Sequence, residues 1–140
     1  MKEKILVSAC LLGVDCKYSG GNNYNEKVLE YIKDYEVIPV CPEIMGGLST
    51  PSEPSARIED KIITKSGNDV TKEYTKGALE TLKLAKLFNV KKALLKAKSP
   101  SCGKGKIYDG TFTGTIIEGN GVTSDLLESN GISVLTEQDL

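Results

Sequence analysis

Histidine is absent from this chain of 140 residues, and its absence removes several kinds of active site at once. Without it there can be no Ser-His-Asp triad, no Cys-His nucleophile pair, no HExxH zinc site and no histidine general base. Any chemistry must therefore use cysteine, carboxylate, lysine or hydroxyl side chains, or a bound cofactor.

A long apolar run is also missing. Residues 1–8 contain only a few apolar side chains, far fewer than the core of a signal peptide or a membrane span needs. We therefore expect a cytoplasmic protein with no membrane partner. Charge of one sign does not dominate either, because 18 basic and 19 acidic side chains give a formal charge of −1. This balance disfavours nucleic acid as the main partner.

The length and the hydrophobic pattern predict one α/β domain over residues 1–140. Short aliphatic and β-branched runs predict buried strands, and apolar side chains at three- and four-residue spacing predict helices between them. The predicted strands are residues 4–8, 36–40, 93–98 and 132–135, and the predicted helices are residues 25–35, 71–88 and 124–129.

Two further segments have the composition of turns and short strands. Residues 46–68 are rich in Ser, Pro and Gly and contain one strand-like run, 56–64, which predicts a hairpin over one end of the sheet. A turn at 108–111 leads into another predicted strand, 112–117. Strands that alternate with helices favour parallel pairing with right-handed crossovers. The predicted fold is therefore a single-domain Rossmann-like three-layer sandwich with a mostly parallel sheet and a small hairpin insertion.

Three of the four cysteines follow predicted strands. Cys10 comes after the first strand, Cys41 after the second and Cys102 after the third, while Cys16 lies further along the loop of Cys10. The carboxyl ends of parallel strands meet at one edge of the sheet, where ligands bind. In a reducing cytoplasm such thiols are more often ligands or catalysts than disulfide partners. We therefore expect them to gather in one site.

The cysteine spacing leaves several interpretations open. Iron–sulfur clusters and zinc both bind thiolates, but structural zinc sites usually use CxxC pairs, and no CxxC occurs here. Three scattered thiolates suit a cubane cluster whose fourth iron is open to a substrate. A thiol nucleophile, and buried cysteines that pack as small apolar residues, are the alternatives.

The residues next to two cysteines favour a functional site. Cys41 lies between two prolines and is followed by the carboxylate of Glu43, and Cys102 follows Ser101 in a turn of small residues. An ordinary strand-to-loop turn is the alternative interpretation at each position. Lysines around the third strand could balance the charge of a thiolate-bound cluster or lie in solvent.

Four segments of the chain, in order, resemble the 2-thiouracil desulfidase family. They are VSACLLG with CKYSG at 7–20, VCPE at 40–43, GNDVT at 67–71 and KSPSCG at 98–103. The resemblance extends over nearly the whole chain, and four ordered motifs make it far more specific than any single one.

This resemblance implies a compact α/β fold, a [4Fe–4S] cluster and non-redox replacement of a thiocarbonyl sulfur by oxygen. By position, Cys10, Cys41 and Cys102 match the cluster ligands, with Cys16 as a candidate further ligand. Glu43 and Ser101 match the family's proton-transfer pair. The implied substrate is a small thiolated pyrimidine such as 2-thiouracil, which would give uracil and sulfide.

Two functions of other classes are the alternatives. One is a non-catalytic module that binds zinc or an iron–sulfur cluster. The other is a cofactor-free cysteine enzyme, which requires a thiol with a depressed pKa. The sequence carries no information on the oligomeric state.

Overall fold

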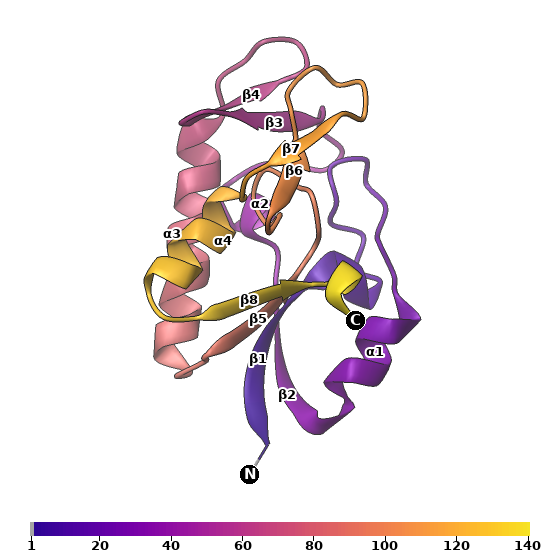
Figure 1. Cartoon of the computed structure of the whole chain (residues 1–140), viewed down its shortest axis with the longest axis vertical. Coiled ribbons are helices and arrows are strands. Elements are labelled where there is room, and N and C mark those ends of the chain that lie inside the picture. Colours follow the sequence, from indigo (N-terminus) through magenta and orange to yellow (C-terminus); the bar gives the residue numbers. More distant parts are fainter. Residues whose placement is uncertain (1) are drawn as a thin grey trace.

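The centre of the molecule is a four-stranded parallel sheet. A computed structural model of the chain describes residues 2–140. Its central strands are β1 (Glu3–Ser8), β2 (Tyr35–Val40), β5 (Lys92–Leu95) and β8 (Ser133–Thr136), and they lie in the order β2-β1-β5-β8 (Figure 1). All three pairings are parallel. The chain first adds β2 on one side of β1 and then β5 on the other, so the strand order reverses between β1 and β5.

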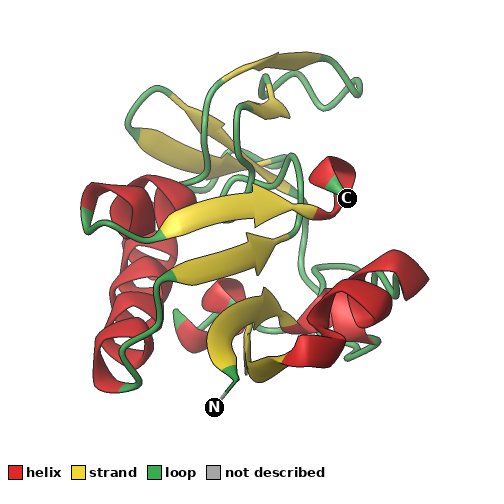
Figure 2. Ribbon diagram, turned by 60° about the horizontal axis from the view of Figure 1, so that its bottom comes forward, coloured by secondary structure: helices red, strands yellow, loops and turns green. Residues whose placement is uncertain are grey.

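Helices cover both faces of this sheet, as Figure 2 shows. On one face lie α3 (Thr71–Leu87) and α4 (Val122–Ser129), whose buried side chains Leu82, Ala85 and Leu127 pack with the sheet. On the other face lies α1 (Glu26–Tyr31), which buries Val28. The predicted α/β three-layer architecture is confirmed.

Two antiparallel hairpins lie beyond the carboxyl edge of the sheet (Figure 1). The first, which we call the roof hairpin, pairs β3 (Ser55–Ile58) with β4 (Lys61–Thr64), where the sequence predicted one. The second pairs β6 (Lys106–Tyr108) with β7 (Ile116–Glu118). The predicted strand at 112–117 is wrong in its bounds, because Phe112 adopts a positive φ of 58° and its segment forms the connection between the two strands.

Other element boundaries also differ from the sequence prediction. The third central strand ends at Leu95 rather than at residue 98, because the N–H of Lys96 donates to the side chain of Ser8 and Lys98 has a positive φ. The helix predicted over 25–35 ends at Tyr31, a 3₁₀ turn (Ile32–Asp34) follows, and Tyr35 already belongs to β2. The helix predicted over 124–129 begins two residues earlier, at Val122.

Three short helical turns were not predicted. They are η1 (Ala9–Leu12), α2 (Pro42–Met45) and η3 (Glu137–Asp139), and each begins within two residues of the end of a central strand. Segments this short carry too few residues for a periodic pattern. Within residues 2–140, no helix combines the length and the apolar character that crossing a bilayer requires.

Helix α2 contacts α3 through glycines. A Cβ at Gly77 would lie 1.8 Å from the carbonyl oxygen of Pro42, and one at Gly46 would lie 2.0 Å from that of Glu73. These backbones approach so closely that no side chain fits between them. Because α2 carries Glu43, this contact sets where that carboxyl lies.

We expect Gly77→Ala to destabilise the fold by about 2 kcal/mol or more, because the added methyl group must push α2 away from α3. Urea unfolding followed by circular dichroism measures the change. Gly21→Ala is the matched control, since the nearest atoms to a Cβ there are 3.8 Å away. Equal midpoints for the two variants would contradict this account of the contact.

Candidate functional site

A cavity of about 470 Å³ opens at the carboxyl edge of the sheet. The loops that follow β1, β2 and β5 line it from the sheet side, and residues of the two hairpins line it from the other side. All four cysteines are among the lining residues: Cys10, Cys16, Cys41 and Cys102. All four thiols are free. The structure therefore brings these residues together, as their positions after parallel strands predicted.

Each cysteine is placed by a rigid local element. Cys10 lies in η1 directly beyond β1, and its carbonyl accepts the N–H groups of Gly13 and Asn23. Cys41 occupies the N-cap position of α2, where Pro42 starts the helix. The N–H of Cys102 donates to Ser99 Oγ at 2.7 Å, which closes a tight turn. Backbone bonds and a helix start thus fix the thiols before any ligand arrives.

Contacts among the cysteines are close. Cys41 Sγ lies 3.6 Å from the carbonyl oxygen of Cys16. After burial, the neighbouring Cys41 and Cys10 are the main causes that raise the pKa of the Cys16 thiol. The hydroxyl of Ser8 lies 3.9 Å from Cys102 Sγ.

Burial raises the pKa of every cysteine in the site. It raises the pKa of Cys102 to about 12, and it raises the pKa values of Cys10 and Cys41 as well. The thiols are therefore protonated at neutral pH unless a bound cation supplies positive charge. A metal centre does this, since coordination deprotonates a thiol outright.

The donor set fits a cluster better than a single ion. Among the described residues, no three or more His, Cys, Asp and Glu side chains come together closely enough to hold one metal ion. A zinc ion needs its ligands at about 2.3 Å from one centre, whereas a cluster spreads its irons and binds thiolates that are further apart. Sulfur ligands around a cavity, without histidine, therefore fit an iron–sulfur cluster.

Glu43 projects into the same cavity from α2, two residues after Cys41. Burial raises the pKa of its carboxyl to about 7, and a contact with the Tyr74 hydroxyl lowers it in part. Tyr74 itself is buried on α3. A carboxyl with this pKa can both accept and donate a proton near neutral pH.

Ser101 occupies a different place from the other predicted site residues. It is 0% exposed and does not line the cavity. Its hydroxyl lies 2.8 Å from Thr123 Oγ1 and 3.7 Å from Cys102 Sγ. Ser101 therefore contacts the cavity only through Cys102, while Ser8 and Ser99 line the cavity directly.

Lys96 is a site residue that the sequence did not single out from its neighbouring lysines. Its Nζ lies 2.9 Å from Glu137 Oε2, and the N–H of Ala97 donates to the other oxygen of Glu137 at 2.7 Å. The contact with Glu137 keeps the ammonium of Lys96 at the cavity wall. The positive charge of this ammonium lowers the pKa of Cys10 in part, against the rise that burial causes. The partner is 41 positions away in the chain, so no local pattern indicated it.

Comparison with known proteins identifies the family. A family model described as 2-thiouracil desulfurase matches residues 5–139. The chain belongs to the 2-thiouracil desulfurase family. The resemblance seen in the four ordered motifs is thereby confirmed.

Two relatives match over nearly their full lengths. An uncharacterised protein of Bacillus subtilis (strain 168), YbbK, is 45% identical over an alignment of 146 positions, which covers 97% of this chain and 97% of that protein. A solved structure of a [4Fe–4S]-dependent thiouracil desulfidase, TudS, is 42% identical with a TM-score of 0.91. That similarity covers 99% of this chain and 93% of the TudS chain.

In the metal-free protein we expect iodoacetamide at pH 7 to modify Cys41 first, because it alone of the four cysteines is partly exposed. All four should react more slowly than free cysteine, since raised pKa values leave little thiolate. Peptide mass spectrometry over time measures the order, and the urea-unfolded chain is the control. Modification of Cys16 or Cys102 ahead of Cys41 would contradict the burial described.

Proposed function

We propose that this protein is a [4Fe–4S]-dependent desulfidase that acts on a thiolated pyrimidine such as 2-thiouracil and gives uracil and sulfide. The observation that carries the proposal is the convergence of thiols from three strand ends on one cavity, beside the carboxyl of Glu43. Membership of the 2-thiouracil desulfurase family and the similarity to TudS support it.

Cys10, Cys41 and Cys102 are the proposed cluster ligands. They follow three neighbouring strands, β1, β2 and β5, so their positions relative to one another are set by the sheet. Cys16 lies on the same cavity and is the candidate further ligand. When bound, a cluster with one iron free of cysteine supplies a Lewis-acid site for the sulfur of the substrate.

Glu43 is the proposed proton-transfer group. Its carboxylate accepts a proton from a water molecule as the water oxygen bonds to the ring carbon that carries sulfur. Glu43 then returns this proton to the sulfur, the carbon–sulfur bond breaks, and the sulfur leaves as hydrosulfide. The hydroxyl oxygen that remains on the ring carbon loses its second proton to solvent and becomes the new carbonyl. The raised pKa of Glu43 suits both halves of this transfer.

Ser101 is the proposed second member of the pair, as its position in the motif implies. In the structure its hydroxyl contacts Cys102 Sγ and Thr123 Oγ1, so it would leave Thr123 to reach a ring nitrogen or the departing sulfur. The proposal therefore requires the buried Ser101 side chain to give up its contact with Thr123 and to reach past Cys102 into the cavity.

The two alternative functions fit the site less well. A cysteine nucleophile needs a lowered pKa, and burial raises the pKa of all four thiols. A closed binding module would leave no space beside its metal, whereas here the cysteines line only part of a cavity of about 470 Å³.

We expect the protein reconstituted without oxygen to be brown and to hold four irons and four sulfides per chain, the content of one [4Fe–4S] cluster. Cys10→Ser, Cys41→Ser and Cys102→Ser should each lose most of this content, and Cys16→Ser should retain it. Iron and acid-labile sulfide analysis measures it. A colourless, iron-free wild-type protein would end the cluster proposal, and iron loss in Cys16→Ser would add a fourth ligand.

Glu43→Gln should keep its iron but lose roughly a hundredfold or more in kcat, because an amide cannot take the proton from water. Sulfide release from 2-thiouracil measures the rate. Glu36→Gln is the matched control, since Glu36 is exposed and lies near the start of β2, away from the cavity. Equal rates for these two variants would remove Glu43 from the mechanism.

A further inference from the structure

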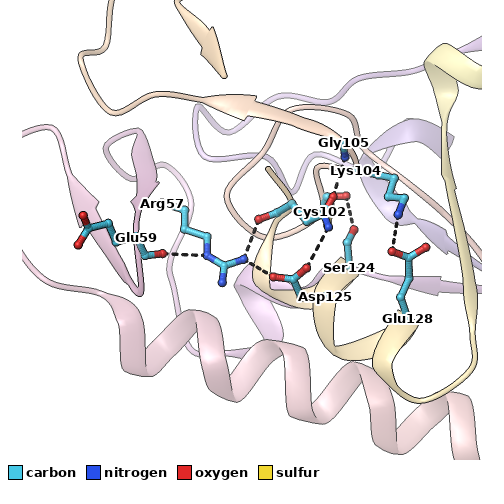
Figure 3. A network of polar contacts seen from close by, with 9 residues as sticks. Arg57, Glu59, Cys102, Lys104, Gly105, Ser124, Asp125 and Glu128 are labelled. Atoms are coloured by element: carbon cyan, nitrogen blue, oxygen red, sulfur yellow. Dashed lines mark hydrogen bonds and ion pairs between the residues drawn. The ribbon is translucent and has the colours of Figure 1, made fainter. Parts of the chain in front are cut away.

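Arg57 joins the roof hairpin to the rest of the site, and the mechanism above does not use it. Its Nη1 donates to the carbonyl of Asn120 at 2.7 Å and to Asp125 Oδ2 at 2.6 Å, and its Nε donates to the carbonyl of Glu59 at 3.2 Å (Figure 3). The Arg57 side chain is 20% exposed. Arg57 therefore ties β3 to the start of α4.

The acceptors of Arg57 in turn hold the loop that follows Cys102. Asn120 Nδ2 donates to Asp125 Oδ1 at 3.0 Å, and Asn120 Oδ1 accepts the N–H of Gly105 at 2.7 Å. The side chain of Asn120 thus connects the acceptors of Arg57 to the loop that follows Cys102.

The turn of Cys102 is fastened to the same helix end. Ser124 Oγ donates to the carbonyl of Cys102 at 2.7 Å (Figure 3), and the N–H of Gly121 donates to the carbonyl of Gly103, also at 2.7 Å. Gly121 packs so tightly on this turn that a Cβ would lie 2.3 Å from the backbone of Ser101. An ion pair between Lys104 and Glu128 connects the same loop to the opposite, C-terminal end of α4.

Two walls of the cavity are therefore both attached to the N-terminal end of α4. Ser55 and Ala56 line the cavity from the roof hairpin, and Cys102 lines it from the sheet side. Arg57 holds the first wall on α4, and Ser124 holds the second. The separation of these walls determines how a flat ligand sits between them.

We propose that Arg57 is a positioning residue that fixes the roof hairpin at a set separation from Cys102 and so holds the substrate at the cluster. The assignment rests on the proposed function for the identity of the substrate. It follows from the contacts alone that Arg57 acts on the roof hairpin and Ser124 on the cysteine turn. The two residues should therefore have separable effects.

Arginine suits this position better than lysine does. Its planar guanidinium reaches a carboxylate and two carbonyl oxygens at once, whereas an ammonium is a single point charge on a flexible stem. The carboxylate partner is partly exposed, at 45%, so geometry matters here more than Coulomb energy.

The test compares Arg57→Gln, Arg57→Lys and Ser124→Ala in the reconstituted full-length protein. Lys83→Gln is the matched control, because it removes a basic group from an exposed ion pair with Glu80 on α3. Three readouts are needed: hydrogen exchange of the roof hairpin, iron retention against a chelator, and KM and kcat for 2-thiouracil.

For Arg57→Gln we expect roughly tenfold faster exchange in β3 and β4, a KM raised roughly tenfold, kcat within about twofold and unchanged iron retention. Arg57→Lys should show the same pattern to a smaller extent, which keeps the test valid if the glutamine variant folds poorly. Ser124→Ala should lose iron roughly tenfold faster, with wild-type exchange in the roof hairpin.

Wild-type exchange of the roof hairpin in both Arg57 variants would overturn the proposal. An unchanged KM beside faster exchange would overturn it too, because the roof would then not position substrate. A wild-type protein that holds its cluster but releases no sulfide would count against the proposed function instead. In that case, hairpin exchange still decides whether Arg57 holds the roof.

Discussion

Parallel pairing of β1 with both β2 and β5 is the constraint on which the site depends. It points the carboxyl ends of three strands to one edge, and the reversal of strand order between β1 and β5 leaves space there. Cys10 and Cys41 lie within two residues of the ends of β1 and β2, and Cys102 lies in the loop that follows β5. Cysteines up to 92 positions apart therefore line one cavity.

Burial gives this site its chemical character. It raises the pKa of the thiols, so that they stay protonated until a bound metal centre supplies positive charge. It also brings the pKa of Glu43 to about 7, next to those thiols. In the proposed function, a metal centre held by these sulfur atoms would polarise a thiocarbonyl next to a carboxyl that can move a proton. These are the two requirements for exchanging sulfur against oxygen without redox chemistry.

The residues that surround the cavity are held largely by the N-terminal end of α4. The first residues of α4 contact Ser101 through Thr123, Cys102 through Ser124 and the roof hairpin through Asp125. Glycines at 46, 77 and 121 allow the backbones to approach at distances that no side chain permits. The cavity is thus held by backbone contacts and short polar side chains, which leave little freedom to its walls.

The sequence by itself determined the strand and helix order, the α/β class and the positions of the cysteines after strands, because hydrophobic periodicity and turn residues are local signals. Four ordered motifs also pointed to the 2-thiouracil desulfurase family. Only the tertiary structure decided that Ser101 contacts Thr123, that Glu137 holds Lys96 and that Arg57 binds Asp125. Those contacts join residues 22, 41 and 68 positions apart, and no local pattern records which distant side chains packing will bring together.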